Sequence, residues 1–138
     1  MQPVNGNLRR GALFCKGAIA VIHRDEIFIH VKDTYNIEPD YPWARTPDYA
    51  ILRHRSNRKW FAAIVNIMAD KLNLPGRELM DALLLKCDPI LIGSLRSEAG
   101  ILPAYHMNKE HWITVLLDGS CPKEKVFGLI DFSYSLTK

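Results

Sequence analysis

The amino-acid sequence predicts an α+β fold, in which a mainly antiparallel sheet carries helices on one face. Two stretches support this prediction: residues 49–67 and 101–118 each show strand, short polar turn, strand. Segments with helical spacing stand before, between and after these hairpins, and tight turns favour antiparallel pairing. The expected order is helix, two strands, strand, helix, two strands, helix. The chain has 138 residues, 48% of them apolar and 24% charged, which suits one packed domain.

The first helix is expected over residues 25–35, where apolar side chains recur at helical spacing: Ile27, Phe28, Val31 and Tyr35. Asn36 follows the helix and favours its end. Residues 38–47 contain three prolines and predict a rigid, extended crossing segment. We expect Tyr41 and Trp43 of this segment to close an edge of the core.

The first hairpin is expected to pair residues 49–54 with residues 59–67 across a turn at residues 55–58. Serine and asparagine in the turn favour this geometry because their side chains bond nearby backbone groups. Strict alternation in the second strand predicts two faces, one with Lys59, Phe61, Ala63 and Val65 and the other with Trp60, Ala62, Ile64 and Asn66. Because both faces are fairly apolar, this strand is expected to be central.

The middle of the chain predicts a loop or short helix over residues 68–77 and a buried strand over residues 78–87. Asp88 is the expected N-cap of a second helix, with Pro89 at its first position. Gly100 is expected to end that region.

The second hairpin is expected to pair residues 101–106 with residues 111–118. Pro122 then opens a final helix, with Ser120 or Cys121 as its cap.

Charge and cysteine content narrow the classes of function. A net charge of +3 permits nucleic-acid binding without indicating it alone. The cysteines, Cys15, Cys87 and Cys121, are too widely spaced for a disulfide framework or a metal site, which is typical of reduced thiols in the cytoplasm. Lys16 interrupts the only apolar run near the N-terminus, so we expect no membrane association.

Catalytic and metal-binding patterns are missing from the sequence. It contains no GxSxG or HExxH motif and no phosphate-cradling loop, so neither an enzyme nor a cofactor is expected. His106 and His111 are five residues apart across a turn, but no third ligand accompanies them, so no metal site is predicted.

The two predicted hairpin tips hold the chain's clearest functional signal. The first carries the densest positive cluster and the second repeats its chemistry; the candidate nucleic-acid-binding residues are Arg53, His54, Arg55, Asn57, Arg58, Lys59, Trp60, Lys86, His106, Asn108, Lys109, His111 and Trp112. Cationic side chains bind phosphates, and tryptophan stacks on bases. The alternative interpretation is that both tips are solvated turns with the tryptophans buried at their bases.

Several short segments, in this order, carry a resemblance: Tyr41-Pro42-Trp43, Pro47-Asp48-Tyr49-Ala50, Leu52-Arg53-His54, Asn57-Arg58-Lys59-Trp60-Phe61, Leu85-Lys86-Cys87-Asp88-Pro89, Gly100-Ile101-Leu102-Pro103-Ala104-Tyr105-His106-Met107-Asn108-Lys109 and His111-Trp112. Through them residues 22–138 resemble the MmcQ/YjbR family, and residues 1–21 form an N-terminal extension outside the match. The resemblance implies a CyaY-like (frataxin-like) two-layer sandwich and a DNA-binding protein of the double-wing type. The two basic tips are then the natural wings.

Three functions stay open at this point. The first is DNA binding through phosphate contacts at the two tips. The second is a protein-interaction module that uses a sheet edge or the wings to hold a protein partner. The third is a small anionic-ligand site between the wings, held by Lys86, His106, Lys109 and His111.

Overall fold

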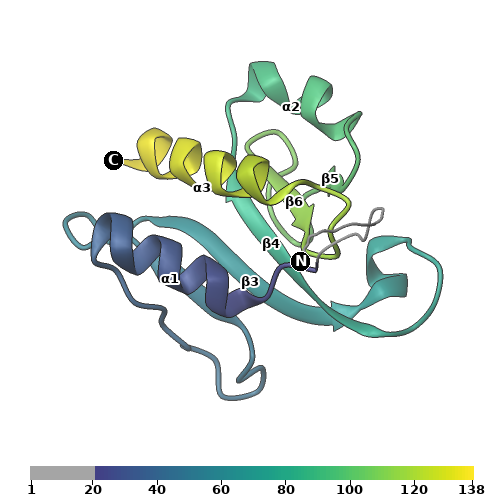
Figure 1. The fold of residues 1–138 in the computed structure, drawn as a ribbon, viewed down its shortest axis with the longest axis horizontal. Helices are drawn as coiled ribbons and strands as arrows, with labels where there is room; N and C mark the ends of the chain where they lie inside the picture. The colour runs from purple at the N-terminus through teal and green to yellow at the C-terminus, as the bar shows by residue number, and fades with distance from the viewer. Residues whose placement is uncertain (1–20) are drawn as a thin grey trace, which may run out of the picture.

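The computed structural model describes residues 21–138. Its elements are α1 (Arg24–Tyr35), β2 (Ala50–Arg53), β3 (Trp60–Met68), the short 3-10 helix η1 (Ala69–Leu72), β4 (Leu79–Lys86), α2 (Pro89–Arg96), β5 (Ile101–Pro103), β6 (Trp112–Leu116) and α3 (Lys123–Thr137). The strands form one antiparallel sheet in the order β2-β3-β4-β6-β5 (Figure 1). The predicted α+β fold and element order are confirmed. The expected N-terminal extension, apart from Val21, and Cys15 lie outside the described residues.

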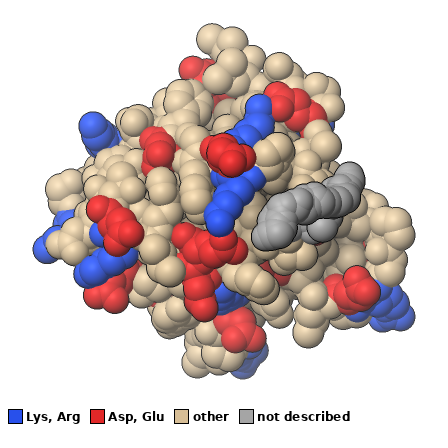
Figure 2. All heavy atoms as spheres, viewed as in Figure 1, with Lys and Arg blue, Asp and Glu red and all other residues tan. Residues whose placement is uncertain are grey.

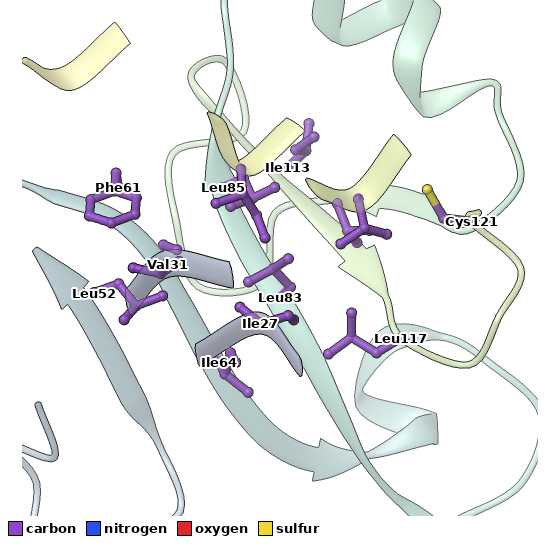
Figure 3. Close-up of a cluster of buried hydrophobic side chains, with 14 of the residues drawn as sticks. Ile27, Val31, Leu52, Phe61, Ile64, Leu83, Leu85, Ile113, Leu117 and Cys121 are labelled. Carbon is purple, nitrogen blue, oxygen red and sulfur yellow. The ribbon is translucent and has the colours of Figure 1, made fainter. Parts of the chain in front are cut away.

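All three α-helices lie on one side of the sheet, with α1 and α3 crossing it and α2 beside β5 and β6 (Figure 1). The main core fills the space between these layers. Figure 3 shows Ile27 and Val31 of α1 close to Leu52, Ile64 and Leu83 of the strands, all of them fully buried. Burying such side chains is the main favourable contribution to folding of a domain this size.

The opposite side of the sheet, called here the open face, carries a second and smaller apolar cluster. Its buried residues come from every strand but β5, and Leu72 of η1 packs among them: Ile51, Ala63, Val65, Ile67, Ala82, Leu84 and Leu116. Half-buried aromatic side chains pack around this cluster: Tyr49, Trp60, Tyr105 and Trp112. No α-helix among the described residues covers them, so aromatic surface faces outward there.

The predicted alternation holds for residues 62–65 of β3, but the faces predicted for Trp60 and Phe61 are wrong because a β-bulge interrupts the start of the strand. Leu52 and Arg53 of β2 pair with Ala62 and Trp60, so Phe61 is left without a partner between them. Phe61 and Ala62 therefore both face the helix-side core, and Trp60 turns to the open face. The remaining open-face residues of β3 are Ala63, Val65 and Ile67. The bulge brings the Trp60 ring onto the same face as these side chains.

The expected start of α2 is confirmed: the Asp88 carboxylate accepts a hydrogen bond from the Ile90 amide at 3.0 Å. The cap expected for α3 is wrong. Pro122 occupies the N-cap position without a side-chain hydrogen bond, because Cys121 is buried in the core and the Ser120 hydroxyl bonds to Asp118. The strands of the second hairpin are also shorter than predicted, since β5 ends at Pro103 and β6 begins only at Trp112.

Candidate nucleic-acid interface

Both hairpin tips lie at the same end of the sheet. The first tip comprises residues 53–60 and the second tip residues 104–111. In the antiparallel register Ala62 pairs with Leu85, and Lys86 pairs with Trp112. The start of β3, the end of β4 and the start of β6 therefore lie at the same end of the sheet, called here the tip end. The sheet holds the two tips together there.

The first tip is a closely bonded turn rather than a loose loop. The Asn57 side-chain oxygen accepts a hydrogen bond from the Lys59 amide at 2.8 Å, and its nitrogen donates to the Thr137 carbonyl at 3.0 Å. Arg58 adopts a left-handed backbone with φ 62°. Asn57 thus shapes the tip and ties it to the end of α3. Its amide is engaged within the protein and is not free for the ligand contact expected from the sequence.

The positive charge of the first tip divides into two parts. The Arg53 guanidinium is half-buried and donates to the Asp40 carboxylate at 3.0 Å, and Arg58 lies 3.8 Å from the same carboxylate. Arg55 and Lys59 are exposed, and within residues 21–138 no carboxylate lies within 4.0 Å of either. Asp40 therefore neutralises Arg53, while Arg55, Lys59 and the outer part of Arg58 face solvent.

His54 does not belong to the exposed interface, which corrects its assignment from sequence. Its side chain is only 2% exposed. The imidazole Nε2 lies 2.7 Å from the Thr137 hydroxyl, and the ring packs against Phe61 and Tyr134. Burial lowers the pKa of His54, which disfavours the charged imidazolium. It packs the tip onto α3, and its buried ring is not accessible to a phosphate.

The second tip is exposed but less basic than the first. The side-chain oxygen of Asn108 accepts a hydrogen bond from the Glu110 amide at 2.8 Å, which shapes this turn as Asn57 shapes the first tip. His106 and Lys109 are exposed, while His111 is half-buried. Because Glu110 is exposed beside Lys109, the net charge of this tip is small.

Lys86 and Trp112 lie between the two tips at the tip end of the sheet. They are paired in neighbouring strands and are both half-buried. The Lys86 ammonium lies 5.7 Å from the centroid of the Trp112 ring, a cation–π geometry. Both candidate residues therefore lie at the end of the sheet that carries the two tips.

An aromatic groove of about 420 Å³ lies on the open face between the tips. Aromatic and apolar side chains from four separate segments line it: Trp43, Tyr49, Ile51, Trp60, Ala63, Val65, Leu84, Tyr105, His106 and Met107. Trp43 is 39% exposed and forms a wall of this groove, so it does not close an edge of the core as expected. Of the four residues proposed for a small anionic ligand between the wings, only His106 lines this groove. Sequence patterns missed the groove because the bulge at Phe61 decides which face Trp60 takes.

A second hollow, of about 290 Å³, lies beside the first tip and is polar. Six charged side chains line it, four basic and two acidic: Lys32, Arg53, Arg55, Arg58, Glu38 and Asp40. Its excess of positive charge extends the basic surface of the first tip toward the end of α1.

The helix-bearing side of the molecule has a different charge pattern. Figure 2 shows Lys and Arg interspersed with Asp and Glu across this side. Ion pairs account for part of this pattern, including Lys123 with Glu26 and Lys125 with Glu98. Mixed signs give no continuous positive surface for a polyanion on this side.

Other chemistry finds little support in the part of the chain that the structure describes. No three His, Cys, Asp or Glu side chains gather there as a potential metal site. Burial raises the pKa of the Cys87 and Cys121 thiols, which disfavours the reactive thiolate. No helix within residues 21–138 is long and apolar enough to span a bilayer.

The model of the YjbR family matches residues 18–136. This chain belongs to the YjbR family. It is 47% identical over 118 residues to "Uncharacterized protein YyaQ" of Bacillus subtilis (strain 168), a match that covers 86% of this chain and 100% of that protein. "Uncharacterized protein YjbR" of Escherichia coli (strain K12) is 44% identical over 54 residues, 38% of this chain and 46% of that protein. The resemblance seen in the sequence is thus confirmed.

Solved structures of similar proteins share the fold. A crystal structure from Pseudomonas syringae is 44% identical, with a TM-score of 0.83, and the match covers 85% of this chain and 100% of that one. The Deinococcus radiodurans protein DR2400 is 25% identical, with a TM-score of 0.62, over 82% of this chain and 76% of that one. The α+β architecture is therefore common to proteins that differ widely in sequence.

Proposed function

We propose that this YjbR-family protein binds nucleic acid through its two hairpin tips, in the manner of a double-wing DNA-binding protein. The observation that supports the proposal best is that both tips lie together at the tip end of the sheet. Exposed cationic side chains of the two tips are the proposed phosphate contacts: Arg55, Arg58, Lys59 and Lys109. Contacts of this kind bind the backbone without selecting a sequence. The proposal involves no catalytic step and, like the cysteine pattern, suits a cytoplasmic protein.

Protein binding by strand addition, the second function left open by the sequence, receives less support from the two edges of the sheet. At the β2 edge, Ile51 already exchanges two backbone hydrogen bonds of 2.9 Å with Asp40. At the other edge, β5 has three residues and ends in Pro103, which has no N–H to donate. Short or occupied edges of this kind resist pairing with a further strand.

The salt dependence of binding tests the proposal. Neutralising about four phosphates predicts that log K falls with log salt at a slope of about −3.6 for duplex DNA and about −2.8 for a single strand. Fluorescence anisotropy of labelled oligonucleotides, measured from about 25 to about 300 mM salt, gives these slopes. Absence of binding at the lowest salt, or a slope near zero, would contradict the proposal.

A further inference from the structure

We propose that the aromatic groove on the open face binds a nucleobase, and that the protein consequently prefers single-stranded nucleic acid to intact duplex. This inference rests on the proposed function for its phosphate contacts and adds the class of nucleic acid. The groove residues that carry it are Trp43, Tyr49, Trp60, Tyr105 and Met107.

The groove rings are fixed in place by contacts with one another. The centroid of the Trp43 ring lies 5.7 Å from that of Trp60 at an interplanar angle of 73°, and 6.2 Å from that of Tyr49 at 89°. Edge-to-face contacts hold these rings without stacking them in parallel. Ring surface is therefore left for a flat ligand, and little conformational freedom is lost when that ligand binds.

The floor of the groove gives it the depth for a planar ring. Ala63 and Val65 of β3 are smaller than the surrounding aromatic side chains, and Leu84 of β4 extends the apolar surface. A volume of about 420 Å³ lies within the usual range of small-ligand sites, about 300–1,000 Å³. An uncharged aromatic heterocycle fits such a lining, whereas a bare phosphate does not.

The position of the groove between the tips supplies the charge complementarity that selects a nucleotide over other flat ligands. The exposed Lys59 directly precedes Trp60, and the exposed His106 lies on the groove rim. The backbone phosphates of a base bound there are expected to reach the exposed cations of the first tip, Arg55, Arg58 and Lys59. In a duplex each base is already paired and stacked, so only an unpaired base offers its face to the groove.

Abasic strands separate base binding from phosphate binding. The parent protein is expected to bind a single strand roughly 5- to 100-fold more tightly than the same strand made fully abasic, which is the effect of stacking one base. Trp43→Ala and Tyr105→Ala, taken from separate groove walls, are expected to lose this preference and keep the salt slope. Tyr41→Ala is the matched control, since Tyr41 is an exposed aromatic in the same segment as Trp43 but does not line the groove.

The outcomes distinguish this inference from the proposed function. Equal binding of normal and abasic strands by the parent overturns the groove assignment and leaves phosphate binding intact. Saturation-transfer NMR with adenosine alone covers the case in which no strand binds: adenine signals that Trp43→Ala abolishes support the groove, and missing signals overturn it. A concentration-dependent dimer that Trp43→Ala dissociates assigns the groove to a second copy of the chain and also overturns the inference.

Discussion

Replacing Arg55, Arg58 and Lys59 with alanine is expected to weaken nucleic-acid binding by roughly 100- to 1,000-fold at about 50 mM salt. These side chains are exposed at the first tip, and only Arg58 has a carboxylate nearby, at 3.8 Å from Asp40. Losing three phosphate contacts removes about 2.7 from the salt slope for duplex DNA and leaves about −0.9. Anisotropy across the same salt series measures both effects.

A control with the same change in net charge makes this result specific to the tip. Lys71 and Arg77 lie at the opposite end of the sheet, and Arg96 ends α2; all three are exposed. Replacing these three with alanine should change affinity only slightly, because exposed charges farther apart than a Debye length of about 10 Å are largely screened. Equal losses in the two triple variants would mean that net charge, and not the tip, determines binding.

Replacing Arg24 with methionine is expected to lower the free energy of unfolding by about 3 kcal/mol. The Arg24 guanidinium donates to both oxygens of the Asp81 carboxylate, at 2.9 and 2.7 Å, and to the Asp48 carbonyl at 2.6 Å. The side chains of Arg24 and Asp81 are only 21% and 23% exposed. Removing the cation leaves a largely buried carboxylate with Asn66 alone as its donor. Urea denaturation followed by circular dichroism measures the loss.

Lys32→Met, on the same helix, is the matched control for Arg24→Met. Lys32 pairs with Glu38 at 3.4 Å, but these side chains are 49% and 76% exposed. An exposed pair of this kind contributes about 0–1 kcal/mol. Similar losses in the two variants would show that the Arg24–Asp81 pair has no special role in joining α1 to β4.

The same pair predicts how stability changes in acid. Burial acts to raise the pKa of Asp81, but the hydrogen bonds from Arg24 and Asn66 outweigh it and hold this pKa below its usual value of 3.8. As the pH falls below that value, the unfolded chain takes up a proton that the folded state resists. The stabilisation from Asp81 is thus present above about pH 4 and is lost as the pH falls through the lowered pKa. In Arg24→Met this part of the acid dependence should disappear.

Local features of the fold were predictable because nearby residues determine them. The spacing of Ile27 and Val31, the cap at Asp88 and the polar turn at Asn57 each act within a few positions along the chain. The bulge at Phe61 was not predictable, because it depends on how β2 and β3 pair and not on the composition of either strand. A single extra residue moved Trp60 and Phe61 to the faces opposite to those expected, while residues 62–65 kept the predicted alternation.

The candidate site was only partly predictable because distant residues decide which charges are free. The sequence suggests that Arg53 is free to contact a phosphate. In the fold its guanidinium donates a hydrogen bond to Asp40, which forms a backbone bridge with Ile51 at the sheet edge. His54 looked like part of the basic tip, but Thr137, far along the chain, receives it in a buried position. The aromatic groove combines four segments that lie apart in the sequence, so no local pattern reveals it.

Amide NMR spectra of the isotope-labelled protein, titrated with a single strand and then with duplex, test most directly whether the two tips form one interface. A chain of 138 residues is small enough for this measurement. We expect the amides of residues 53–60 and 104–112 to shift together, with the same dependence on added oligonucleotide. Shifts confined to one tip, or gathered on the helix-bearing side, would contradict a shared two-tip interface.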